Sequence, residues 1–186
     1  MMTKFRLLPG LPAYGEPATG FPADWATRGH EGLVVEFTND GGETWVGNFQ
    51  PGLGGLDSVL RHPNERDFLV MAKGTLWNVD SLSRTAVELA PTIFQAWPVS
   101  EPDGFIFNRQ DLAFLRYAKS GLLWHTRRIS WDGFKDLNLD ALNISGKAWS
   151  PIDNKWIPFQ VDTRTGRAEG GSMSGPGTGD WEQLSK

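Results

Sequence analysis

Residues 130–133, with the sequence Ser-Trp-Asp-Gly, have the residue types in this chain that best suit a binding site. They place Trp131 beside the carboxylate of Asp132, and Arg127 and Arg128 come just before them. Tryptophan and arginine are the side chains in which binding energy most often concentrates, so this stretch could form a platform for a ligand. A structural interpretation competes with this one, because Asp-Gly is a common dipeptide of tight turns.

Carboxylates are the candidates for catalysis. Asp57, Asp111 and Asp132 could serve a glycan hydrolase or lyase if the fold brought two of them to about 5–10 Å from each other. Residues 52–55 are glycine-rich, but they lack the helix signal and the Lys-Ser/Thr of a phosphate-binding loop, which indicates a tight turn. His62 is expected to be a solvated turn residue. No group of residues meets the requirements of a named mechanism.

The composition excludes several classes of function. The chain has no cysteine and 3 histidines, which leaves no thiol chemistry and makes a zinc site improbable, so we expect no metal and no cofactor. It carries 18 lysines and arginines against 22 acidic residues, which argues against a nucleic-acid partner. Its longest apolar run, residues 68–72, is too short to span a membrane, and its start lacks a signal-peptide core. We therefore predict a cytoplasmic chain without a membrane partner.

The arrangement along the chain indicates one domain with two irregular ends. A length of 186 residues fits a single domain, and 22 glycines and 9 tryptophans favour an all-β body. Residues 1–24 are rich in proline and glycine and are expected to form an extended arm. Residues 25–170 are expected to form a single β-repeat domain, and residues 171–186 a flexible tail.

A repeat runs through the predicted domain. Phe105 lies 37 positions after Phe68, and both residues begin the same pattern of strand, two-residue turn and strand. Flanking strands extend each copy to four, and a looser third copy begins at Phe134. Four-stranded antiparallel units at this spacing are typical of β-propeller blades, because one small sheet must stack on a neighbour. With the hairpin over residues 33–49, the sequence predicts about four units.

Two alternatives to this fold stay open at the level of sequence. The chain could form a β-sandwich or a curled meander with coincidental spacing. Residues 111–121 could also form a helix with Asp111 as its N-cap, although the repeat predicts a strand there. If the repeat is correct, the large aromatic side chains on its strands fill the space between neighbouring sheets. The ones we expect to be buried there are Trp45, Trp77, Phe114 and Trp156.

Residues 38–45 match at each fixed place the pattern Ser/Thr, any, Asp, any, Gly, any, Thr, Trp. They resemble the Asp-box, a hairpin motif of sialidase-type propellers. In such a turn Asp40 accepts backbone N–H groups, Gly42 supplies a positive φ and Trp45 packs into the sheet. The resemblance implies a folding element away from any active site. A sialidase is not supported, because no cluster of three arginines with a tyrosine and glutamate pair can be found.

A broader resemblance covers nearly the whole chain. Its motifs are residues 47–57, the Val-Asp pair at 79–80, residues 123–133, and residues 158–162 with Thr165-Gly166. They are similar to those of a group of uncharacterised bacterial single-domain proteins. This resemblance implies no activity.

The sequence thus predicts a non-catalytic binding or protein-interaction module, acting on an unknown protein or a small polar ligand. The alternatives are a glycan-processing hydrolase or lyase that uses carboxylates, and an immunity-type inhibitor or scaffold protein. We expect the site on the face formed by the loops 50–55, 73–74, 110–111, 129–133 and 150–155, with the Asp-box turn and the turns 81–84 and 163–166 on the opposite face. The candidate ligand-binding residues are Gln50, Asp111, Arg128, Trp131 and Asp132.

Overall fold

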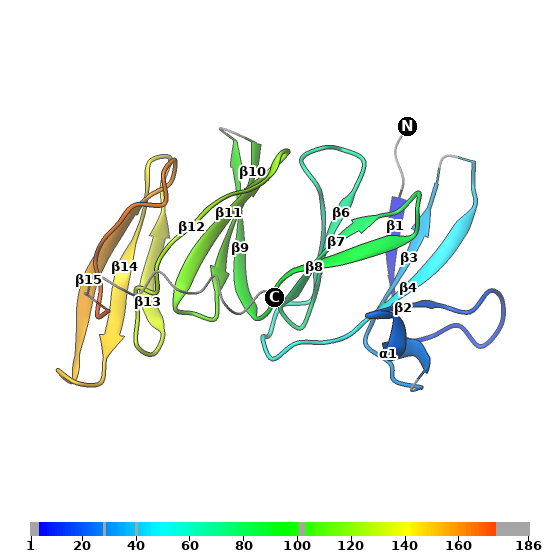
Figure 1. Cartoon of the computed structure of the whole chain (residues 1–186), viewed down its shortest axis with the longest axis horizontal. Helices are drawn as coiled ribbons and strands as arrows, with labels where there is room; N and C mark the ends of the chain where they lie inside the picture. Colours follow the sequence, from blue (N-terminus) through cyan, green and yellow to red (C-terminus); the bar gives the residue numbers. More distant parts are fainter. Residues whose placement is uncertain (1–3, 28, 40, 101–102, 174–186) are drawn as a thin grey trace. The chain divides into compact units, whose positions relative to one another are not determined.

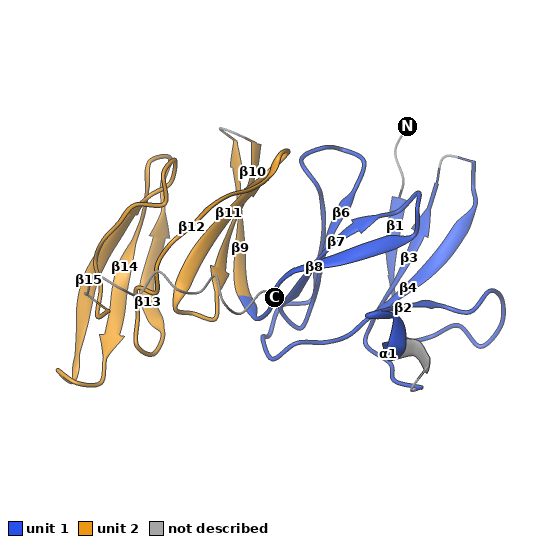
Figure 2. Ribbon diagram, viewed as in Figure 1, with its two compact units in different colours: residues 1–93 blue, residues 94–186 orange. Residues whose placement is uncertain are grey.

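The structure is a computed structural model that describes residues 4–27, 29–39, 41–100 and 103–173. In this part of the chain the fold is all-β: four four-stranded sheets and one short helix, α1, over Ala23–Thr27 (Figure 1). The predicted fold of about four four-stranded units is therefore confirmed. The chain divides into two compact units, Met1–Ile93 and Phe94–Lys186 (Figure 2).

The first unit contains two sheets. The first sheet has the strand order β1-β3-β4-β2, over Lys4–Leu8, Leu33–Thr38, Thr44–Phe49 and Thr19–Phe21. Its strand β2 runs parallel to β4, whereas the other described pairs are antiparallel. The second sheet has the order β5-β6-β7-β8, over Ser58–Arg61, Phe68–Ala72, Thr75–Asp80 and Thr85–Ala90.

An aromatic-rich core joins these two sheets. The ring of Phe37 on β3 lies 5.3 Å from that of Phe68 on β6, and the ring of Phe49 on β4 lies 6.2 Å from that of Trp77 on β7, measured between centroids. All four side chains are buried. Because one small sheet cannot cover both of its faces, each sheet gains its stability by packing on its neighbour.

The second unit repeats this plan. Its first sheet has the order β12-β11-β10-β9, over Gly121–His125, Ala113–Ala118, Asp103–Arg109 and Ile93–Ser100. Its second sheet has the order β13-β14-β15-β16, over Phe134–Leu139, Asn143–Ser150, Lys155–Asp162 and Ala168–Gly170. Phe114 of β11 stacks on Phe134 of β13, with centroids 5.0 Å apart, and joins the two sheets. The strand β11 also shows that the helix alternative for residues 111–121 is wrong.

The aromatic residues predicted to fill these cores are buried in three of four cases. Trp45, Trp77 and Phe114 are buried, but Trp156 is half-buried and does not belong to the described core of its unit. The reason is the register of the loose third copy. If the Val-Asp pair at 161–162 is aligned with that at 79–80, the counterpart of Trp77 is Phe159, and Phe159 is buried in the core.

The two ends of the chain differ in what can be described. Within the expected arm, β1 pairs with β3 and β2 with β4, so two stretches of residues 1–24 belong to the first sheet. Within the expected tail, residues 174–186 lie outside the described residues. The N–H groups of Ser172 and Met173 both donate to the carbonyl of Ile129, so residues 172–173, near the start of the expected tail, are bound to the rest of the second unit. Among the described residues, no helix has the length and apolarity to cross a membrane.

Candidate functional site

The loop from Arg128 to Gly133 connects β12 to β13, and its shape depends on a buried serine. Ser130 is buried, and its Oγ donates to the carbonyl of Gly133 at 2.5 Å. The same Oγ accepts the N–H of Asp132 at 3.2 Å. Gly133 has a φ of 85°, a conformation that favours glycine. The polar residues of this loop therefore form the tight turn that the Asp-Gly dipeptide indicates.

Arg128 supports the loop from the side. Its Nε donates to the carbonyl of Ser130 at 2.8 Å, and its Nη2 donates to the carbonyl of Trp131 at 2.5 Å. The guanidinium also lies 5.5 Å from the centroid of the Trp131 ring, within the range of a cation–π contact. Arg128 thus holds both the backbone and the ring of Trp131 in place.

The segment after β16 supports the loop from a second direction. The N–H of Trp131 donates to Oγ of Ser172 at 3.0 Å, and this Oγ donates in turn to the carbonyl of Trp149 at 2.6 Å. Arg127 fixes the same segment by donating to the carbonyls of Gly170 and Met173. Arg127 and Arg128 are therefore both structural donors to backbone carbonyls.

Asp111 lies beneath the loop and is also engaged in holding the fold. Its Oδ2 accepts the N–H of Phe134 at 3.0 Å, and its Oδ1 accepts Nδ2 of Asn108 at 2.8 Å. A Cβ added to Gly133 would lie 3.1 Å from Oδ2 of Asp111, which shows how closely the loop packs on this carboxylate. Asp111 links the turn between β10 and β11 to the start of β13.

Two groups of the loop remain available to a ligand. The Trp131 side chain is held at the surface with 39% of its area exposed, and Asp132 next to it is also exposed. Within the part of the chain that the structure describes, no hydrogen bond or ion pair engages the Asp132 carboxylate. The loop therefore presents an aromatic ring in a fixed position beside a free negative charge.

Gln50 belongs to the other unit. Its N–H donates to the carbonyl of Phe21 at 2.8 Å, and its side chain is exposed. The glycine-rich stretch that follows packs on the turn between β6 and β7, because a Cβ at Gly54 would lie 3.2 Å from both Cα of Gly74 and the carbonyl oxygen of Lys73. Asp57 ends this loop and accepts the N–H of Lys73 at 2.6 Å. Of the five predicted site residues, the structure brings together Asp111, Arg128, Trp131 and Asp132.

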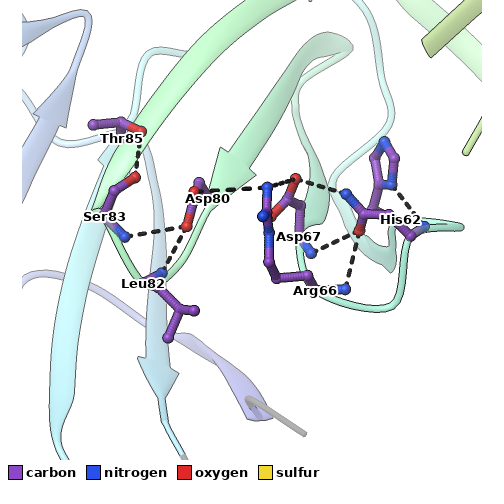
Figure 3. Close-up of polar contacts among 8 residues, drawn as sticks. His62, Arg66, Asp67, Asp80, Leu82, Ser83 and Thr85 are labelled. Carbon is purple, nitrogen blue, oxygen red and sulfur yellow. Dashed lines mark hydrogen bonds and ion pairs between the residues drawn. The ribbon is translucent and has the colours of Figure 1, made fainter. Parts of the chain in front are cut away.

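A polar network that the sequence reasoning missed lies in the first unit, between the loop that joins β5 to β6 and the turn after β7 (Figure 3). His62 is 3% exposed, so the expectation of a solvated turn residue is wrong. Its Nδ1 accepts the N–H of Asn64 at 2.9 Å, and Nδ2 of Asn64 donates to Asp67 at 2.8 Å. Arg66 donates to Asp67 through Nε at 2.9 Å and faces Asp80 at 3.9 Å.

The ionisation of this network follows from its surroundings. Burial lowers the pKa of His62 below its ordinary value of 6.5, although Asp67 and Asn64 act in the opposite direction. Burial by itself would raise the pKa of Asp80, but the N–H groups of Ser83 and Leu82, together with the charge of Arg66, lower it overall. Both shifts favour a neutral imidazole at His62 and an ionised carboxylate at Asp80.

The network stabilises the fold and does not resemble a catalytic centre. Oδ1 of Asn64 accepts the N–H groups of Arg66 and Asp67, which shapes the loop as a turn around its side chain. Asp80 caps the next turn in the same manner by accepting the N–H groups of Leu82 and Ser83. The spacing of Asn64 and Asp67 is the sequence signal that could have indicated this loop.

No protein-family model matches this chain, and no curated protein is significantly similar to it. Within the described residues, no group of three or more histidines, aspartates or glutamates is placed to hold a metal ion.

Proposed function

We propose that this protein is a non-catalytic binding module whose site is the loop from Arg128 to Gly133. The observation that carries the proposal is the exposed Trp131, which two residues hold in place through three contacts: Ser172 on its N–H, and Arg128 on its carbonyl and its ring. An aromatic side chain that is fixed before binding loses little conformational freedom when a partner covers it. Tryptophan in such a position is a frequent centre of binding energy.

The hydrogen bonds of the candidate catalytic carboxylates support a binding function over hydrolysis. Asp57 accepts the N–H of Lys73, and Asp111 accepts the N–H of Phe134, so both carboxylates serve the backbone. A general acid or nucleophile needs a carboxyl group that reaches the substrate. Asp132 alone is left for such a role, and a glycosidase of the usual kind uses two.

The chemistry of the loop indicates what it would bind. Asp132 offers a negative charge beside the Trp131 ring, a pair that suits a basic side chain of a protein partner or a small polar ligand with a cationic group. The ligand would meet the end of the sheet at which β13 begins. A cytoplasmic location stays a prediction from the sequence.

The experiment compares captured ligands between variants. The wild-type chain, Trp131→Ala, Asp132→Ala and Leu142→Ala are immobilised, exposed to lysate of the source organism, and the retained proteins and small molecules are quantified by mass spectrometry. Leu142 is the matched control, because it is 57% exposed and lies in the turn at the other end of β13. We expect a ligand that wild type and Leu142→Ala retain and that the two loop variants lose.

Thermal melting first establishes that each variant is folded. Equal retention of every captured ligand by Trp131→Ala, Asp132→Ala and wild type would contradict the proposed site. Loss in Leu142→Ala alone would place the site at the opposite end of the sheet.

A further inference from the structure

The sheet β13-β14-β15-β16 has one face that takes no part in the described core of its unit. Alternate residues of β14 and β15, including Ile144, Ala148, Phe159 and Val161, point into that core. Since side chains alternate between the faces of a strand, the residues between them lie on the other face, here called the outer face. On β14 and β15 these are Asn143, Ser145, Lys147, Trp149, Trp156, Pro158, Gln160 and Asp162.

A polar groove lies at one end of the outer face. Its volume is about 390 Å³, and each residue that lines it is polar or charged. Asn143 and Gln160 supply amide groups, which both donate and accept hydrogen bonds, while Glu169 supplies acceptors and Arg167 supplies donors. Oδ1 of Asp162 already accepts hydrogen bonds from Arg164 and Thr165, so this carboxylate offers a ligand its Oδ2. The groove is lined by Asn143, Gln160, Asp162, Thr165, Arg167 and Glu169.

Two tryptophans lie at the other end of the same face. Trp149 and Trp156 are partners in the register of β14 and β15, and their ring centroids are 5.2 Å apart. Both are half-buried, and Nζ of Lys135 lies 4.5 Å from the centroid of Trp156. Trp149 is six strand residues from Asn143, and Trp156 is six from Asp162. At the usual rise of a strand, six residues span about 20 Å. The outer face is therefore long enough for an extended ligand.

The charges of the outer face balance. Lys147 pairs with Asp136 at 2.9 Å, and Arg167 pairs with Glu169 at 3.3 Å. The remaining charges, Lys135 and Asp162, are of opposite sign. A nucleic acid or another polyanion needs an excess of cations, and a polycation needs the reverse, so neither is complementary to this face. A protein partner would need an apolar centre with few charges, which the groove does not provide.

We propose that the outer face binds a neutral oligosaccharide, with the sugar hydroxyls in the polar groove and a sugar ring against Trp156. Amides, carboxylates and a guanidinium match the donors and acceptors of hydroxyl groups, and an aromatic ring matches the apolar side of a sugar ring. This inference goes beyond the proposed function, because it concerns the face of the sheet and does not depend on the loop that holds Trp131.

The test is affinity gel electrophoresis of the full chain in gels that contain one soluble polysaccharide each. The neutral probes are xylan, mixed-linkage β-glucan, galactomannan and glycogen, and the charged probe is heparin. We expect retardation by at least one neutral polysaccharide and none by heparin. Titration calorimetry with the hexasaccharide of the retarding polymer then gives the affinity.

Three variants locate the site. Gln160→Ala and Trp156→Ala are each expected to weaken hexasaccharide binding about tenfold, the effect of one lost hydrogen bond or ring contact. Glu88→Ala is the control, because Glu88 is an exposed strand residue of β8 in the other unit. If Trp156→Ala does not fold, Thr165→Ala replaces it.

The outcomes decide the proposal. No retardation by any neutral polysaccharide, or retardation by heparin alone, overturns it. Unchanged affinity in both Gln160→Ala and Trp156→Ala, or an equal loss in Glu88→Ala, also overturns it. None of these results bears on the binding role proposed for Trp131, which the capture experiment tests.

Discussion

Trp45 and Ser81 are joined by a buried hydrogen bond: Nε1 of Trp45, on β4, donates to the backbone carbonyl of Ser81 at 2.9 Å. The second unit has the same contact, since Nε1 of Trp124, on β12, donates to the carbonyl of Thr163 at 3.1 Å. In each unit, a tryptophan of one sheet thus attaches to the turn between the last two strands of the next sheet.

Both acceptor carbonyls belong to turns of the same design. Asp80 accepts the N–H groups of the second and third residues after it, and Asp162 does the same. The next residue in each turn, Arg84 or Gly166, has a positive φ. Turns 81–84 and 163–166 therefore share one pattern of hydrogen bonds, as corresponding turns in two copies of a repeat would.

The contribution of the indole hydrogen bond can be isolated with two matched substitutions. Trp45→Phe removes the donor to Ser81, while Trp77→Phe removes an indole N–H without a hydrogen-bond partner among the described residues. Both tryptophans are buried, so the loss of ring volume is similar. We expect Trp45→Phe to lower the free energy of unfolding by about 1 kcal/mol more than Trp77→Phe, measured by urea denaturation. Equal losses would show that the bond does not stabilise the unit.

The Asp-box-like turn offers a test of backbone conformation. Gly42 has a φ of 81°, so Gly42→Ala forces a strained backbone and should cost about 1 kcal/mol of stability. Gly55→Ala is the control, since Gly55 lies outside the positive-φ region and a Cβ there would meet no atom within 4 Å. Melting temperatures that fall equally in both variants would contradict this assignment. Asp40 lies outside the described residues, and Oδ1 of Asn39 accepts the N–H of Glu43 in this turn.

Asp111 and Asp132 should differ in how strongly their substitution destabilises the protein. Asp111→Ala removes the acceptors of Phe134 and Asn108, and we expect a loss of about 1–3 kcal/mol in the free energy of unfolding. Asp132→Ala changes an exposed side chain and should stay within about 0.5 kcal/mol of wild type. Chemical denaturation of both variants gives the comparison. A large loss in Asp132→Ala would mean that its carboxylate holds the loop and is not available to a ligand.

The buried His62 should make the stability of the protein depend on pH. Well above pH 6.5 the imidazole is neutral in both the folded and the unfolded chain. As the pH falls through 6.5, the unfolded chain binds a proton at His62 more readily than the folded chain, whose pKa is lower, so stability declines. In His62→Gln we expect a smaller decline between pH 7.5 and 5.5, measured by urea denaturation at each pH. Parallel declines in the two proteins would show that His62 is not responsible.

The fold was predictable because its information is local. The repeated pattern of strand and turn gave the positions of three sheets and the hairpin gave the centre of the first, but strands β1 and β2 were not predicted. The turns around Asp80 and Asp162 could be aligned by sequence alone. Where the copy was loose, this approach failed: Trp156 was expected in the core, but Phe159 occupies that position. The register of a strand shifts its side chains between faces with each single residue, so a small error of alignment reverses what is buried.

The sequence predicted which residues belong to the candidate site, but not what each of them does there. The sequence by itself determined that Asp111, Arg128, Trp131 and Asp132 lie in loops at strand ends, but the tertiary structure decided their roles. The sequence leaves Asp111 and Arg128 available to a ligand, but in the fold Asp111 accepts the N–H of Phe134 on β13 and Arg128 donates to the carbonyls of Ser130 and Trp131 in its own loop. Residue types fix which hydrogen bonds are possible, whereas partners such as Phe134 for Asp111 and Ser172 for Trp131 come from segments distant along the chain. Which side chains remain for a ligand is therefore decided only once the sheets have packed.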